Sequence, residues 1–295
     1  MSIKNQYFLH NQTFRLRAAD DLNPELWFHV ATNSLTCTLF ASGNRIPLFN
    51  QQLKLLTTQF DHLNWPVPGF LTDPGLRDSL VGLINKNRIL KGSLIKILVF
   101  PSSRSLNNQQ SGLTFEYLAF ITEMTVDHLP LNELGLHAGI KLLKADRESQ
   151  ASSWCHPDIN RLQMNHEARS KGLDLILLKE MNAILPQTSH GYLFSVSKNN
   201  VLAPLPVDGY RASAIAGLVP DLCRMAGLSF TALNKTTEQS LMDADELFVA
   251  DDLNGFNWIL ALGNKRFFRK KVQVLSDILN RMLRSEDQLS IGSSG

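Results

Sequence analysis

Residues 160–196, NRLQMNHEARSKGLDLILLKEMNAILPQTSHGYLFSV, decide the fold of this chain. The first part, residues 160–172, mixes polar and apolar side chains and ends at a glycine, which predicts a surface helix with a glycine C′ residue. The apolar run Leu173–Leu178 follows and predicts a strand. Farther on, Leu193–Val196 and Val201–Ala203 are expected to pair as a hairpin. This order predicts a lobe in which helices and strands are mixed.

The chain beyond this stretch continues the mixture. Apolar residues recur at helical spacing in some segments and form short continuous runs in others. The expected helices are Ser213–Ala226, Thr237–Met242 and Val272–Arg284, and the expected strands are Glu246–Ala250 and Trp258–Leu262.

The N-terminal part also combines both kinds of element. Aromatic and β-branched residues are concentrated in Leu26–Phe40, which predicts one or two strands. Leucines at helical spacing predict helices over Leu48–Leu63 and after Asp73-Pro74, where the aspartate suits an N-cap and the proline the first helical position. The remaining expected strands are Gln6–Leu9, Thr13–Leu16, Ser93–Phe100 and Thr114–Thr125.

A change in composition divides the chain. Residues 145–157 form a long polar connection without apolar periodicity, so a domain boundary is expected near them. We predict an N-terminal α+β lobe over residues 1–125, a linker region over 126–157 and a C-terminal α+β lobe over 158–295. The predicted fold class is therefore α+β with two lobes.

Composition excludes several classes of protein. The chain has 295 residues, of which 44% are hydrophobic, and its net charge is +2. This composition excludes a disordered chain, and the near-zero charge favours neither a nucleic acid nor an anionic membrane as partner. Three cysteines without CxxC spacing argue against a disulfide framework and a zinc site. No apolar run is long enough for a signal peptide or a membrane helix, so a cytoplasmic protein is expected.

Short chemical motifs are absent from the sequence. It contains no GxGxxG, Walker, HExxH, GxSxG or CxxC pattern. The eight histidines are scattered without metal-ligand spacing, so no metal site is predicted. The pair Asp251-Asp252 is read as the solvent-exposed end of a strand, and a metal-binding pair is the alternative. The basic cluster Arg266, Arg269, Lys270 and Lys271 is read as a solvated face, and a phosphate or dimer contact is the alternative.

The second half resembles the class IV aminotransferases, the pyridoxal-phosphate enzymes of fold type IV. The tripeptide Asn160-Arg161-Leu162 matches the NRL or NYL sequence of that family, in the form typical of aminodeoxychorismate lyases. Further matches are Glu167-Ala168, Gly172, Asp174, Ala244-Asp245-Glu246, Phe248 and Gly255. The first half fits more loosely, at Arg17–Asp21 and in the Leu48–Leu63 helix. The resemblance implies a two-lobed, D-amino acid aminotransferase-like fold and a homodimer.

Two residues that carry the chemistry of this family differ here. The lysine that forms the aldimine lies three residues before the NRL asparagine, where this chain has Pro157, and proline has no amine. Lys141, Lys144 and Lys171 are not at that spacing. The glutamate that holds the pyridine nitrogen protonated aligns with Gln187, which cannot stabilise a positive charge on that nitrogen.

The phosphate site of the family also differs. The GITR-like helix start aligns with Ser213-Ala214-Ile215-Ala216 and lacks the arginine. The hydroxyl residue that contacts the phosphate after the ADE strand aligns with Asp252, a carboxylate that would face a dianion. The arginine and histidine of the family's N-terminal helix align with Lys54 and Gln51. The resemblance with these departures implies a scaffold that no longer holds pyridoxal phosphate in the ordinary way.

Three functions remain open from the sequence. The first is a repurposed pocket that binds or transforms a small carboxylate or aromatic metabolite, without a cofactor. The second is an active aminodeoxychorismate-lyase-like or aminotransferase enzyme that uses pyridoxal phosphate. The third is a non-catalytic dimeric interaction protein. For the repurposed pocket, the alternative is that His190 and Tyr192 merely fill the space that the cofactor left. The candidate pocket residues are His29, Lys54, Asn160, Arg161, Gln187, His190, Tyr192, Asp251 and Asp252.

Overall fold

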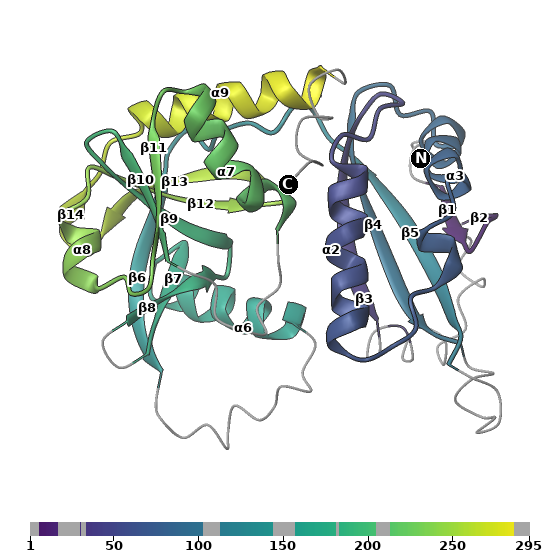
Figure 1. The fold of residues 1–295 in the computed structure, drawn as a ribbon, viewed down its shortest axis with the longest axis horizontal. Coiled ribbons are helices and arrows are strands. Elements are labelled where there is room, and N and C mark those ends of the chain that lie inside the picture. Colours follow the sequence, from purple (N-terminus) through teal and green to yellow (C-terminus); the bar gives the residue numbers. More distant parts are fainter. Residues whose placement is uncertain are drawn as a thin grey trace. The chain divides into compact units, whose positions relative to one another are not determined.

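The computed structural model describes residues 6–16, 30, 34–102, 113–143, 157–180, 183–204 and 213–285, without the side chains of 157–162 and 187. The chain forms two compact units. Unit 1 comprises Met1–His128 together with the C-terminal residues from Leu283 onward, and unit 2 comprises Leu129–Met282. Both units combine helices and strands (Figure 1), which confirms the α+β class.

Unit 1 is built on an antiparallel sheet of five strands in the order β2-β1-β5-β4-β3. Its strands are β1 (Tyr7–His10), β2 (Thr13–Leu16), β3 (Leu35–Ser42), β4 (Gly92–Pro101) and β5 (Phe115–Glu123). Its helices are α2 (Phe49–His62), the short 3-10 helix η1 (Gly69–Leu71) and α3 (Gly75–Lys86). Successive side chains of β4 point to opposite faces of the sheet. Ile95 and Ile97 belong to the core cluster that includes residues of α2 and α3, whereas Leu98 and Phe100 belong to a second, smaller cluster.

Unit 2 is a sheet that closes on itself. Strand β8 pairs with both β7 and β9, so the six strands β9, β12, β13, β6, β7 and β8 form a ring. Strands β10 and β11 extend from β9, and β14 pairs with β13. The strands are β6 (Leu136–Leu143), β7 (Leu175–Glu180), β8 (Ala183–Thr188), β9 (Gly191–Ser197), β10 (Asn200–Pro204), β11 (Ser229–Leu233), β12 (Glu246–Asp251), β13 (Gly255–Leu262) and β14 (Lys265–Arg266).

The described part of unit 2 also contains the helices α6 (Pro157–Ser170), α7 (Ala214–Met225), α8 (Glu238–Met242) and α9 (Lys270–Arg284) (Figure 1). Buried residues of the ring strands, among them Leu177, Leu193, Leu247 and Ile259, form one core cluster. Burial of these side chains is the main stabilising contribution to the unit, because each removes a large apolar area from water. No helix among the described residues is both long and apolar enough to cross a membrane.

Some segments differ from the sequence-based expectation. The region predicted as a linker, residues 126–157, contains β6, which pairs in parallel with β13 and β7. This strand is fixed by hydrogen bonds to two segments that are distant in the sequence. The sequence of residues 136–143 alone does not predict these pairings. The expected strands over Leu26–Phe40 reduce to β3, which begins at Leu35, while Val30 is helical and the other residues between 26 and 33 lie outside the description.

Candidate functional site

The C-terminal end of β12 carries two of the predicted pocket residues. There the turn between β8 and β9 packs directly against the strand at Gly191. A Cβ on Gly191 would lie 2.3 Å from the Ala250 carbonyl oxygen and 2.7 Å from the Asp251 Cβ, and its φ is +121°. Only glycine suits both the contact and the backbone. This contact holds the backbone of the turn that carries His190 and Tyr192 against the end of β12.

Asp252 follows β12 in the sequence, and its side chain contacts the first turn of α7. Its Oδ1 accepts hydrogen bonds of 3.0 Å from the Ser213 hydroxyl and 3.0 Å from the Ile215 backbone N–H. The Ser213 oxygen in turn accepts from the Ala216 N–H at 3.1 Å, so Ser213 is the N-cap of the helix. The first turn of a helix is a preferred place for an anion, because its backbone N–H groups point outward and the dipole favours negative charge. Here the anion is a side chain of the protein itself.

Asp251 has a different role from Asp252. It is 7% exposed, and its Oδ1 accepts from the backbone N–H groups of Leu253 at 2.8 Å and Asn254 at 2.6 Å. Its Oδ2 accepts from the Asn254 side-chain amide at 3.1 Å. The carboxylate thus fixes the turn between β12 and β13. The expectation of a solvent-exposed strand end is therefore wrong for Asp251, because its carboxylate is buried and accepts hydrogen bonds from the N–H groups of the turn. No group of three or more potential metal ligands occurs in the described ranges.

The turn between β8 and β9 is held by its own hydroxyl groups. The Thr188 hydroxyl donates to the Gly191 carbonyl at 3.0 Å and accepts from the His190 N–H at 3.0 Å. The Ser189 oxygen lies 2.9 Å from His190 Nδ1. His190 is therefore oriented by a neighbouring side chain and is half-buried. Tyr192 pairs through its backbone with Ala250 on one side and Gln187 on the other.

Two of the lysines considered in the sequence analysis share one carboxylate. Pro157 is the first residue of α6. Lys141 on β6 and Lys171 after α6 donate to opposite oxygens of Glu167, at 2.5 Å and 2.8 Å. The hydrogen bond from Lys141, followed by that from Lys171, lowers the pKa of the Glu167 carboxyl. Lys144 lies outside the described residues.

The other predicted pocket residues are only partly described. Lys54 lies on α2 in unit 1, and its backbone carbonyl accepts hydrogen bonds from the hydroxyls of Thr57 and Thr58. His29 lies outside the described residues, as do the side chains of Asn160, Arg161 and Gln187. Within unit 2 the backbone at Gly191, between His190 and Tyr192, contacts Ala250 and Asp251, whereas the Asp252 carboxylate reaches α7.

The sequence placed Ser213 in the stretch aligned with the phosphate site but gave it no contact, and it did not identify Ser189. Ser213 is visible in the sequence as a serine directly before an apolar helical run, which is an N-cap signal. Its contact with Asp252 is not visible, because 39 positions separate the two residues. Nothing local in the sequence distinguishes Ser189 from an ordinary turn serine.

The opposite end of β12 carries a second carboxylate at a helix start. Glu246 is 3% exposed, and it accepts from the backbone N–H groups of Lys271 and Val272 at 3.0 Å each. It therefore caps the first turn of α9. Strand β12 thus places one carboxylate at each of two helix starts, Glu246 at α9 and Asp252 at α7.

Known proteins resemble this chain in structure only. No family model and no curated protein matches it in sequence. The branched-chain amino acid aminotransferase of Thermobaculum terrenum, in its pyridoxal-phosphate form, superposes with a TM-score of 0.79 at 14% identity, over 95% of this chain and 94% of that one. The branched-chain aminotransferase of Escherichia coli gives 0.77 at 13% identity over 97% of both chains.

A fold IV transaminase of Curtobacterium pusillum superposes with a TM-score of 0.74 at 13% identity, over 95% of this chain and 98% of that one. Nearly the whole length is covered in each comparison. The fold is therefore that of the class IV aminotransferases, as the resemblance in residues 160–255 implied. Identities this low establish the fold, and the chemistry has to be argued from the residues of this chain.

Proposed function

We propose that this chain is a class IV aminotransferase-like protein with a degenerate pyridoxal-phosphate site. In this proposal the site has been repurposed to bind or transform a small carboxylate or aromatic metabolite. The start of α7 carries the proposal, because it is where the resemblance locates the phosphate of the cofactor.

The contacts of Asp252 are the observation on which the proposal rests. A phosphate group at this helix start needs the Ile215 N–H and the Ser213 hydroxyl as donors, and Asp252 accepts from both at 3.0 Å. A phosphate dianion would therefore have to displace a carboxylate and would be repelled by it. The residues present do not fit a phosphate group at this position.

The amine required for covalent attachment is also missing from its usual position. Pro157 stands where the family has its lysine. The two described lysines that the sequence analysis considered, Lys141 and Lys171, are bound to Glu167, near the other end of α6 from Pro157. This supports a site without an internal aldimine.

The turn between β8 and β9 and the start of β9 carry side chains that offer recognition of a different kind. The His190 ring, oriented by Ser189, provides a nitrogen that can bind or exchange a proton. Tyr192 provides an aromatic ring for a planar ligand and a hydroxyl for a polar one. Such groups suit a small carboxylate or aromatic metabolite.

A titration with pyridoxal phosphate tests the proposal. Wild type, Asp252→Thr, Pro157→Lys and the double variant are titrated, and the imine is followed by visible absorbance and trapped with borohydride. We expect no trapped imine in the wild type and a higher affinity in the double variant than in either single one. Asp252→Asn is the matched control, because the amide oxygen can keep the helix contacts without the charge.

A stoichiometric imine on one lysine of the wild type would contradict the proposal and favour the active lyase or aminotransferase. A thermal-shift screen of carboxylates and aromatic acids then separates the repurposed pocket from a non-catalytic interaction protein. Stabilisation that is lost in His190→Ala supports the pocket.

We also propose that the chain forms a homodimer, as the resemblance implies. Sedimentation equilibrium should give twice the chain mass of 33.1 kDa at micromolar concentration. A monomer under those conditions would contradict this part of the proposal.

A further inference from the structure

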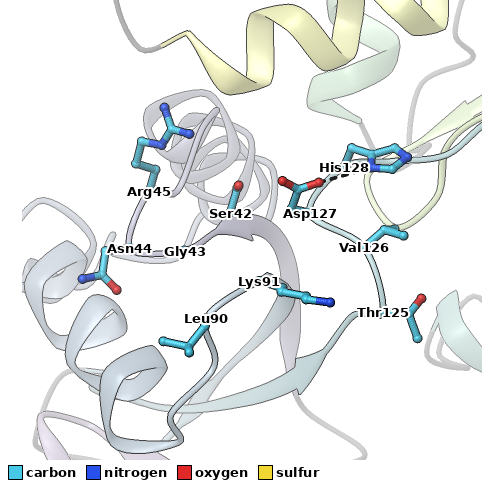
Figure 2. A pocket seen from close by; sticks show the side chains of 10 residues that line it. All are labelled: Ser42, Gly43, Asn44, Arg45, Leu90, Lys91, Thr125, Val126, Asp127 and His128. Carbon is cyan, nitrogen blue, oxygen red and sulfur yellow. Dashed lines mark hydrogen bonds and ion pairs between the residues drawn. The ribbon is translucent and has the colours of Figure 1, made fainter.

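Unit 1 contains a hollow that is separate from the residues discussed so far. It has a volume of about 610 Å³ and lies where three turns of the unit meet (Figure 2). One turn follows β3 at residues 42–45, the second precedes β4 at residues 90–91, and the third follows β5 at residues 125–128. Ligand sites in proteins have volumes of roughly 300–1,000 Å³, so the hollow has room for a small metabolite.

The walls of this hollow are fixed by the backbone. The Gly43 N–H donates to the Lys91 carbonyl at 3.0 Å, which joins the first two turns. The Met124 N–H donates to the Gly92 carbonyl at 2.8 Å, and a Cβ on Gly92 would lie 2.1 Å from the Val126 oxygen. The third turn is therefore held against the second. A hollow with fixed walls requires little ordering when a ligand binds.

Two opposite charges lie on different walls of the hollow. Asp127 and Ser42 both line the hollow, and Figure 2 shows the Lys91 ammonium projecting from another turn. Within the described residues no hydrogen bond or ion pair engages the Lys91 ammonium. Asp127 lies 3.3 Å from His128 Nδ1 and 3.7 Å from the Arg284 guanidinium.

The Asp127 carboxyl is held in its ionised form by these neighbours. The hydrogen bond with His128, and then the charge of Arg284, lower the pKa of this carboxyl. Arg45 also lines the hollow, and its guanidinium donates to the Arg284 carbonyl. An anion alone would meet the Asp127 charge, and a cation alone would meet the Lys91 charge. A molecule that carries both charges complements both walls.

We propose that this hollow binds a small zwitterionic metabolite of the amino-acid type. Its ammonium group is held by the Asp127 carboxylate and the Ser42 hydroxyl, and its carboxylate is held by the Lys91 ammonium. The proposal does not depend on the function proposed above, because every residue that it uses belongs to unit 1.

Calorimetric titration of the full chain with matched ligands tests this proposal. The probes are L-phenylalanine, L-leucine and L-glutamine, each compared with the acid that lacks the ammonium and the amine that lacks the carboxylate. We expect at least one amino acid to bind at least about tenfold tighter than both of its analogues, because charge-assisted hydrogen bonds are lost in each analogue.

Variants locate the binding in the hollow. Lys91→Met and Asp127→Asn should each weaken it at least about fivefold, since both side chains are exposed and their contribution is screened by water. Lys235→Met removes an exposed lysine of unit 2 and should leave the affinity unchanged, and thermal unfolding confirms that each variant is folded. The proposal is overturned if none of the three amino acids binds, if the deaminated acids bind as tightly, or if Lys91→Met binds like the wild type.

Discussion

The two ends of β12 offer a comparison within one strand. Glu246 at its start accepts from the first turn of α9, and Asp252 just beyond its end accepts from the first turn of α7. At α7, Ser213 already serves as the N-cap through the Ala216 N–H. Asp252 is therefore a second acceptor at a helix start that has its own cap, whereas Glu246 itself accepts the first N–H groups of α9.

A carboxylate that accepts hydrogen bonds from the first turn of a helix can therefore have two different roles. A buried carboxylate such as Glu246 stabilises the fold, because it satisfies backbone donors that would otherwise be buried without a partner. Asp252 occupies a position that a ligand anion could take, since the helix start is capped without it. The comparison teaches that an anion site can be closed by one side chain while the helix that forms it remains intact.

The largest effect is expected at Gly191, which supports the Asp252 end. Gly191→Ala should lower the free energy of unfolding by about 3 kcal/mol or more, since the new Cβ meets backbone atoms at an unfavourable φ. Chemical denaturation measures this loss. Gly172→Ala is the matched control, because Gly172 has φ +66° with nothing within 4 Å, and it should cost only about 1–2 kcal/mol.

The next effect concerns the α9 end. Glu246→Ala should lower the free energy of unfolding by about 2–3 kcal/mol, because buried N–H groups of Lys271 and Val272 lose their acceptor. Denaturation curves with and without inorganic phosphate should show the same loss. If Glu246→Ala lowered the free energy of unfolding less than Asp252→Ala, Glu246 would not be the carboxylate that stabilises the fold more.

A smaller loss is expected for Asp252→Ala, about 1 kcal/mol, since Ser213 still caps α7. Inorganic phosphate should then stabilise this variant more than the wild type, because the Ile215 N–H and the Ser213 hydroxyl become available to an external anion. Thermal unfolding at increasing phosphate concentration is the measurement. Equal phosphate responses of variant and wild type would show that the carboxylate does not close the site.

The smallest effect is the coupling between Ser213 and Asp252. A double-mutant cycle with Ser213→Ala and Asp252→Ala should give an interaction energy of about 0.5–1 kcal/mol, because one hydrogen bond of 3.0 Å joins the two side chains. Denaturation of the four proteins supplies the values. Additive losses would mean that the two groups act on α7 independently.

Local patterns predicted much of the fold. The helix at residues 160–172, the strand after it and the following hairpin correspond to α6, β7 and the β9–β10 pair. Each of these depends on periodicity or turn residues within a few positions. Strand β6 was not predicted, because its partners β13 and β7 lie far along the chain. Strand β8 was also not predicted, although its partners β7 and β9 are its neighbours in the sequence. Its run of six residues contains Pro186, which argues against a strand with partners on both sides.

The site was harder to predict than the fold. Alignment to the family placed Asp252 beside a phosphate, but the sequence could not show that its carboxylate reaches Ser213 and Ile215 instead. It also could not show that Asp251 turns inward onto the β12–β13 turn. Such contacts depend on the orientation of one side chain among several donors, and no pattern of residue types encodes that orientation.

The closed ring of unit 2 has a consequence for the order in which the chain matures on the ribosome. Strand β6 is synthesised before the other strands of the ring, but it pairs with β13. The pairing of Leu136 with Ile259 can therefore form only after Ile259 has been synthesised. Pairing over such a sequence distance is slow, because the loop must be closed before the contacts form. Until then β6 exposes an unpaired edge. Unit 2 should therefore fold late, after nearly all of the chain has emerged, and be the part that most needs chaperones during synthesis.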